Sequence, residues 1–238
     1  MPNSTVVPEQ ALKMPSSTPG PNRQPIDPPV VVLLHGLART RRMLGPLQKH
    51  LEASGFETWA RTYPSRKHSL AELTDWLTDA IRTDLGDRPV TAVTHSMGGI
   101  LLRHLADRFD WRRAVLVAAP NQGSVAASVF SANRLFRAVY GRAAPELADS
   151  ASWPAPPSPF AVIAGTRAVS VANPPSLVTR LLRVIPADQP SDGTVTVAET
   201  RLPDMADFAT IDATHTWIMQ HPQTLAMATH FLRTGRLT

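Results

Sequence analysis

The sequence predicts an α/β fold with a mainly parallel sheet of about six strands and helices on both faces. From Val30 onward, short apolar runs alternate with segments whose apolar residues recur at helical spacing, as in repeated strand–helix units. Runs such as VVVLL are apolar throughout, which is typical of strands that are covered on both faces. The chain has 238 residues, a length that suits one domain of this architecture.

Each element of this fold has its own sequence signal. The apolar runs predict strands at residues 30–34, 58–62, 90–93, 114–117, 160–163 and 208–211. Helical spacing predicts a helix from Met43 through Leu51 that stops near Gly55, and further helices at 69–85, 97–108 and 222–233. A Ser-x-x-Glu capping box at Ser69 and Glu72 marks the start of the second helix. Right-handed crossovers between parallel strands then leave few topologies.

Proline and loop length indicate the domain organisation. Eight of the 23 prolines fall in residues 1–29, and proline sustains neither a helix interior nor a central strand. We therefore expect a Pro-rich N-terminal arm at 1–29, with a helical turn near 9–14, followed by one domain at 30–238. Residues 121–159 separate the fourth and fifth predicted strands, and a connection of this length over the sheet is expected to serve as a cap or lid.

Composition excludes several classes of site and partner. The chain has no cysteine, so disulfides, thiolate metal sites and cysteine nucleophiles are ruled out. The net charge of +5 comes mostly from scattered arginines rather than a long basic run with aromatics, so no nucleic-acid partner is expected. No apolar run approaches about 18 residues, so no integral membrane segment is expected, whereas peripheral contact with an anionic membrane surface stays open. The first residues lack the features of a secretory signal, which favours a cytoplasmic protein.

The stretch PVTAVTHSMGGILLRHLAD, residues 89–107, places a serine between a buried strand and a helix. At such a sharp turn, the hydroxyl of Ser96 stands above the sheet edge provided that its neighbours are small. Gly98 and Gly99 meet this requirement. Thr94 lies two residues before the serine, a position where glycine is common in such turns. Because threonine has a side chain, the facing helix must lie further away. The alternative for Ser96 is a purely structural helix cap.

A second candidate segment, HGLART, follows the first predicted strand directly. A glycine after His35 lets the backbone turn so that the next N–H points into the site, where it can stabilise an oxyanion. The predicted oxyanion-hole donors are therefore the amides of Leu37 and Met97. His35 itself is expected to pack beneath this loop and to support it rather than to catalyse.

A serine nucleophile needs a base, and the base needs an orienting carboxylate. SDGTVTV places Asp192 in a turn, and ATHTWIM places His215 just after the last predicted strand. The order Ser96, Asp192, His215 is the order that accompanies a strand–turn–helix nucleophile elbow. Asp188 is the reserve carboxylate, whereas Asp212 lies too close to His215 along the chain to reach the far imidazole nitrogen easily.

The other histidines indicate no metal site. His95 adjoins the serine, and a residue at this position of an elbow normally points away from it. No pair of histidines has a metal-ligand spacing such as His-Glu-x-x-His, so no metal is expected. The remaining histidines of the chain, which also lack such a spacing, are His50, His68, His104, His221 and His230.

Together, LLHGL, THSMGG, SDGTV and the histidine of ATHTW resemble the α/β-hydrolase superfamily, in its serine esterase and lipase-like branch. The resemblance covers the chain from Val30 to its C-terminus. It implies a minimal six-stranded fold and hydrolysis of small-molecule or lipid esters through an acyl-serine intermediate, by Ser96, Asp192 and His215, without a cofactor. Two alternatives remain: an acyltransferase that uses the same triad, and a non-catalytic binding protein with this fold.

Overall fold

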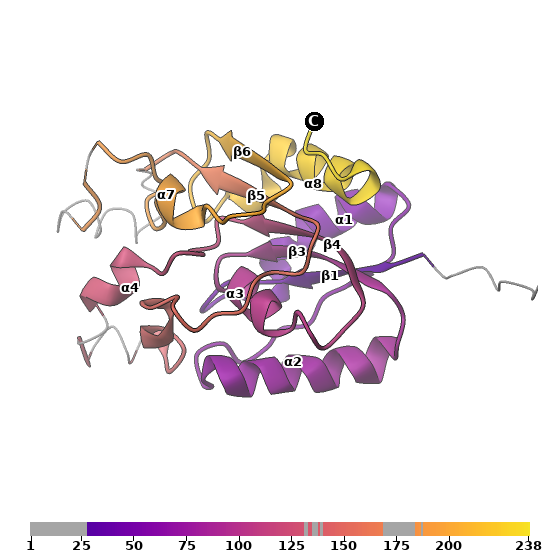
Figure 1. Cartoon of the computed structure of the whole chain (residues 1–238), viewed down its shortest axis with the longest axis horizontal. Helices are drawn as coiled ribbons and strands as arrows, with labels where there is room; N and C mark the ends of the chain where they lie inside the picture. Colours follow the sequence, from indigo (N-terminus) through magenta and orange to yellow (C-terminus); the bar gives the residue numbers. More distant parts are fainter. Residues whose placement is uncertain (1–27, 131–132, 135–137, 139, 169–183, 187) are drawn as a thin grey trace, which may run out of the picture.

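A six-stranded, fully parallel sheet runs through the molecule in the order β2-β1-β3-β4-β5-β6 (Figure 1). The computed structural model describes residues 28–130, 133–134, 138, 140–168, 184–186 and 188–238. The strands are β1 (Val30–Leu34), β2 (Thr58–Trp59), β3 (Val90–His95), β4 (Trp111–Val117), β5 (Phe160–Gly165) and β6 (Asp207–Ile211).

Helices cover both faces of this sheet, which confirms the predicted fold class (Figure 1). Alternate residues of β1 enter two separate cores because side chains alternate across a strand. Val31 and Leu33 pack with residues of α1 (Gly45–Ala53) and α8 (Pro222–Thr234). Val32 and Leu34 pack with residues of α2 and α3 on the opposite face. The other helical elements include α2 (Leu70–Leu85), α3 (Met97–His104), α4 (Val125–Phe130) and α7 (Val197–Thr200), with the short 3-10 helices η1 (Arg41–Leu44), η2 (Pro145–Leu147) and η3 (Ile218–Gln220).

Two predicted elements are shorter than expected, each because of a tertiary contact. The strand predicted at 58–62 ends at Trp59, and the chain leaves the sheet so that the N–H of Tyr63 donates to Nε2 of His35 at 3.2 Å. The helix predicted at 97–108 ends at His104. There, the indole N–H of Trp111 donates to the carbonyl of Leu105 at 2.9 Å. In a longer helix this carbonyl would accept a backbone hydrogen bond from the next turn.

The connection at 121–159 packs against the domain through a buried arginine. Arg103 on α3 is only 5% exposed, and its guanidinium donates to the carbonyls of Asn121, Trp153 and Pro154. The same guanidinium lies 5.5 Å from the centre of the Trp153 ring. One side chain of the core therefore anchors both ends of this connection, and any movement of the proposed cap would be confined between these attachments.

Replacing Arg103 by methionine should lower the free energy of unfolding by about 2–4 kcal/mol, because three carbonyls, two of them in buried hydrogen bonds, would lose a donor. Urea unfolding at neutral pH measures this change. Arg108→Met is the matched control: Arg108 is exposed and lies 3.9 Å from exposed Asp75, so its loss should cost less than about 1 kcal/mol. Equal effects of the two substitutions would contradict a special anchoring role of Arg103.

Most of the predicted arm, including the helical turn near 9–14, lies outside the described residues. Only Pro28 and Pro29 of that arm belong to the described part of the chain. The division into an arm, a domain and a cap therefore stays a prediction.

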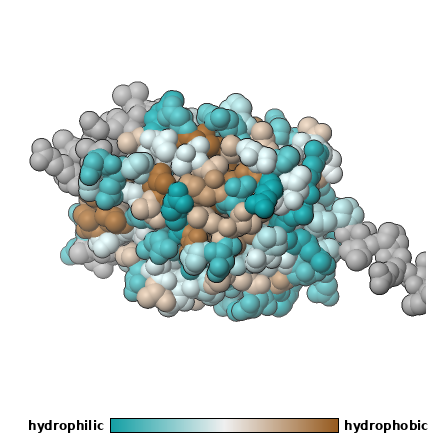
Figure 2. Space-filling view, turned by 45° about the horizontal axis from the view of Figure 1, so that its top comes forward, coloured by the Kyte–Doolittle hydropathy of each residue, from teal (hydrophilic) through white to brown (hydrophobic). Residues whose placement is uncertain are grey.

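The visible face of the molecule in Figure 2 is largely hydrophilic or neutral, with apolar side chains exposed in separate areas between polar ones. Among the described residues, the exposed large apolar side chains are Val125 (44%), Val129 (55%) and Trp217 (47%). No helix in the described ranges combines the length and the apolar character that a bilayer crossing requires.

Candidate active site

Ser96 stands at the junction of β3 and α3 in a strained backbone conformation. Its φ of 53° and ψ of −124° lie in a region that residues with a Cβ rarely adopt. The backbone around it is held on both sides, since the N–H of Ser96 donates to the carbonyl of Val117 at 2.9 Å and its carbonyl accepts from Gly99 at 2.8 Å. The expected sharp turn is therefore present at this serine.

The two glycines after the serine allow close packing that any side chain would prevent. A Cβ on Gly98 would lie 2.5 Å from the carbonyl oxygen of Leu34 at the end of β1. A Cβ on Gly99 would lie 2.7 Å from that of Ala119 and 3.3 Å from the hydroxyl of Thr94. The room that Thr94 requires is thus provided across from it by the absence of a side chain on Gly99.

The side chain of His215 lies between those of Ser96 and Asp192. Its Nε2 is 3.0 Å from the Ser96 hydroxyl oxygen, and its Nδ1 is 2.7 Å from Oδ2 of Asp192. The loop after β6 carries His215, and a backbone bond of 3.0 Å from its N–H to the carbonyl of Asp192 ties the two loops together. His215 is therefore within hydrogen-bonding distance of both other residues selected from the sequence.

Asp192 is buried and held by its own turn. Its Oδ1 accepts from the N–H groups of Thr194 at 2.9 Å and Val195 at 2.8 Å, which leaves Oδ2 for His215. The rival carboxylate of Asp212 instead pairs with Arg167 at 2.6 Å on the surface, and this hydrogen bond lowers the pKa of Asp212. No hydrogen bond joins the reserve candidate, Asp188, to His215 within the described residues.

The loop after β1 passes directly against the serine. A Cβ on Gly36 would lie 3.2 Å from that of Ser96 and 2.9 Å from Nδ1 of His95, so only glycine allows this approach. Leu37 follows in the loop, and Met97 is the first residue of α3. Within the described part of the chain, neither of their N–H groups donates to a protein acceptor.

His35 is buried beneath this loop, as expected from its place in the sequence. Its ring stacks on that of Tyr63 at 3.8 Å, and its Nδ1 is 2.8 Å from the carbonyl of Gly36. The Tyr63 hydroxyl also donates to the backbone carbonyl of His35. Burial lowers the pKa of His35 to about 4, so the ring is neutral near pH 7. These contacts make His35 a support for the loop.

His95 has a role that sequence reasoning missed. Its ring lies 4.7 Å from the ring of His215. Nε2 of His95 is 2.9 Å from the backbone carbonyl of His215, to which it can donate while its unpartnered Nδ1 carries no proton. Burial, followed by the positive charge that His215 can carry, lowers the pKa of His95. The residue beside the serine thus helps hold the loop that carries His215, and no local sequence pattern identifies that contact.

The two buried histidines should make the protein less stable in acid. In an unfolded chain, histidine titrates near pH 6.5, whereas the folded-state pKa of His35 is about 4 and that of His95 is also lowered. The unfolded state therefore binds these protons first as the pH falls. The stability is fully present above about pH 6.5 and is lost progressively below it.

While both groups contribute, the free energy of unfolding should fall by about 2–3 kcal/mol per pH unit between roughly pH 6 and pH 5. Urea unfolding across this range measures the slope. His230→Gln, at an exposed position of α8, should leave the slope unchanged. A pH-independent urea midpoint would show that the two rings are not held neutral by burial.

Comparisons with known proteins agree with this architecture. The model of the alpha/beta hydrolase family matches residues 31–230. A mature lipase of Bacillus licheniformis, BlEst2, superposes with a TM-score of 0.67 at 18% identity, covering 88% of this chain and 96% of the lipase. Its propeptide form gives a TM-score of 0.65 at 16% identity, with 88% and 52% covered.

A metagenomic carboxyl esterase, MGS0156, superposes with a TM-score of 0.60 at 20% identity, over 86% of this chain and 71% of the esterase. At these identities the likeness concerns the fold alone. No curated protein sequence matches the chain significantly. Since the family model spans most of the chain, the chain belongs to the alpha/beta hydrolase family, and its six-stranded parallel sheet agrees with this.

Proposed function

We propose that this protein is a serine hydrolase that cleaves carboxylic esters through an acyl-serine intermediate. The observation that carries the proposal is the continuous chain from the Ser96 hydroxyl to Nε2 of His215 at 3.0 Å, and from Nδ1 of His215 to Asp192 at 2.7 Å. Two proteins with similar folds are described as a lipase and a carboxyl esterase, which supports an ester as the substrate class.

In the first half of the reaction, Nε2 of His215 takes the proton of Ser96 as the hydroxyl oxygen attacks the ester carbonyl. Asp192 keeps the proton of His215 on Nδ1 and stabilises the imidazolium. The N–H groups of Leu37 and Met97 donate to the oxyanion of the tetrahedral intermediate. When this intermediate collapses, the ester C–O bond breaks and the imidazolium protonates the leaving alcohol.

In the second half, His215 takes a proton from water as the water oxygen attacks the acyl-serine carbonyl. Collapse of the second tetrahedral intermediate releases the carboxylic acid and returns the proton to Ser96. All of these steps use groups of this chain and water, so the proposed reaction needs no other reactant.

A fluorophosphonate probe tests the nucleophile, and a chain-length series of p-nitrophenyl esters tests the reaction. We expect the probe to add to Ser96, as identified by peptide mass spectrometry, and the wild-type protein to release p-nitrophenol. Preincubation with the probe should abolish that release. Labelling without hydrolysis, together with ester formation when an alcohol is added, would point to an acyltransferase. Absence of both labelling and turnover would point to a non-catalytic binding protein.

A further inference from the structure

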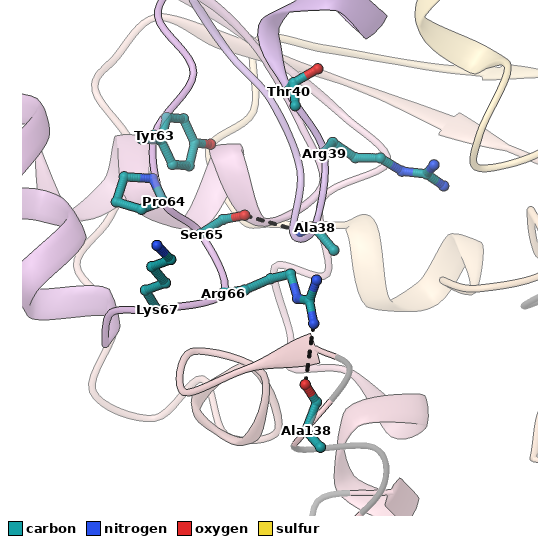
Figure 3. Close-up of a pocket in the computed structure, with 9 residues that line it drawn as sticks. All are labelled: Ala38, Arg39, Thr40, Tyr63, Pro64, Ser65, Arg66, Lys67 and Ala138. Atoms are coloured by element: carbon teal, nitrogen blue, oxygen red, sulfur yellow. Dashed lines mark hydrogen bonds between the residues drawn. The ribbon is translucent and has the colours of Figure 1, made fainter.

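A cavity of about 520 Å³ lies beside the loop that carries the proposed oxyanion donor Leu37 (Figure 3). Three cationic residues line it: Arg39 from the loop after β1, and Arg66 and Lys67 from the segment between β2 and α2. In the close-up, Arg66 lies between Lys67 and Arg39, the guanidinium of Arg39 points away from Lys67, and Ser65 and Pro64 are in the same segment as Arg66 (Figure 3). No acidic residue belongs to the lining of this cavity.

Among the described residues, no ion pair neutralises the positive charge of these three residues. Arg39 donates to the hydroxyl of Thr216 at 3.0 Å, and Arg66 donates to the carbonyl of Ala138 at 3.2 Å, both uncharged acceptors. Within the described residues, no carboxylate lies within 4.0 Å of any of the three cationic groups. A concave site lined by one sign of charge attracts a ligand of the opposite sign.

An adjacent cavity of about 550 Å³ shares Arg66 and Lys67 but differs in its charge. It is also lined by Arg142, which pairs with Glu72 at 3.0 Å, and by the carboxylate-bearing Glu146. Among the described residues, the lining of the first cavity contains no acidic side chain, whereas that of the second contains Glu146. We call the first the cationic cavity and define it by Arg39, Arg66 and Lys67.

The cationic cavity is connected to the proposed catalytic groups through short contacts. Arg39 lies two residues after Leu37. Its guanidinium donates to the hydroxyl of Thr216, the residue that follows His215. The N–H of Ala38, between Leu37 and Arg39, donates to the hydroxyl of Ser65 at 3.0 Å, so one wall of the cavity supports the oxyanion loop. A ligand seated among these cations thus lies against the same loop that faces Ser96.

We propose that the cationic cavity binds an anionic group, a phosphate or carboxylate, of the ester substrate. This inference rests on the proposed function and narrows its substrate class to esters that carry a negative charge. Arginine offers several N–H donors in a planar arrangement that suits phosphate and carboxylate oxygens, and lysine adds a point charge. The anionic group can belong to a soluble ester or to the head group of an anionic phospholipid.

A pair of isosteric substrates tests the proposal in solution. Mono-4-nitrophenyl glutarate carries a terminal carboxylate, and 4-nitrophenyl 5-methylhexanoate carries an isopropyl group in the same place. The wild-type protein should have a higher kcat/KM for the anionic ester, chiefly through a lower KM. Changing both Arg66 and Lys67 to glutamine should reduce the ratio of the two kcat/KM values by about fivefold to tenfold. Raising the salt concentration from about 0.05 M to about 0.5 M should reduce the wild-type ratio as well.

The matched control is Lys49→Gln, which removes one exposed positive charge from α1, away from the cationic cavity. It should leave the ratio of the two kcat/KM values unchanged. An equal ratio in the wild-type protein and in the Arg66→Gln, Lys67→Gln variant would overturn the proposal while leaving ester hydrolysis by Ser96 intact.

Direct binding separates failure of this inference from failure of the proposed function. Calorimetric titration of inorganic phosphate into the Ser96→Ala protein should show binding that the Arg66→Gln, Lys67→Gln changes abolish, whether or not any ester is turned over. Unchanged binding in that variant overturns the proposal. Cosedimentation with vesicles of phosphatidylcholine and phosphatidylglycerol in equal parts then identifies the source of the anion. Binding lost with the two cations indicates a lipid head group, and phosphate binding without vesicle binding indicates a soluble ester.

Discussion

Replacing Ser96 by alanine is expected to lower kcat for p-nitrophenyl butyrate hydrolysis on the order of 10⁶-fold, because no other group can form the covalent intermediate. Stability should change little, since alanine keeps the Cβ at the strained φ of 53° and loses only the hydroxyl. Steady-state kinetics measures the activity, and thermal unfolding verifies the fold.

Two further variants make this expectation specific. Adding His215→Ala to Ser96→Ala should cause almost no additional loss, because the residues of a catalytic triad act as a unit. Ser152→Ala, at an exposed turn, should keep the wild-type rate. Full activity of the Ser96→Ala protein would refute the proposed nucleophile.

Replacing Asp192 by asparagine should lower kcat on the order of 10⁴-fold while preserving the hydrogen-bond geometry. The reason lies in the turn that holds the side chain. Because the N–H groups of Thr194 and Val195 donate to Oδ1, the asparagine oxygen must take that position. Its NH₂ group then faces His215 and forces the imidazole proton onto Nε2, where the ring cannot accept the proton of Ser96.

Kinetics with the same ester measures the effect of Asp192→Asn. Asp212→Asn is the control, since this carboxylate pairs with Arg167 at the surface, and its replacement should change kcat less than about twofold. A large loss in Asp212→Asn with little loss in Asp192→Asn would reverse the assignment of the carboxylate.

Much of the fold could be predicted because its signals are local. The β1 run VVVLL, the capping box at Ser69 and Glu72, and the strand–serine–helix junction at Ser96 each act over a few residues. Element ends were less predictable: β2 and α3 end early because of Tyr63 and Trp111, which contact groups elsewhere in the fold.

For the candidate site too, some features could be predicted from local sequence and others depend on the tertiary structure. Chain order and turn chemistry single out Ser96, Asp192 and His215 as candidates, and the structure brings their side chains together. The choice of Asp192 over Asp188 and Asp212 depends on which carboxylate faces Nδ1 of His215, a question of position in space. The placement of Gly99 opposite Thr94 is likewise a matter of packing.

The sequence by itself determined the order of strands and helices, the sharp turn at the serine and the identity of the candidate nucleophile and base, since periodicity and turn preferences act over short stretches of chain. Only the tertiary structure decided that His95 holds the loop of His215, 120 residues away, and that Arg39, Arg66 and Lys67 share one cavity. Those contacts arise when separate loops meet above the parallel sheet. Their energy depends on residues from several segments, so no single segment predicts them.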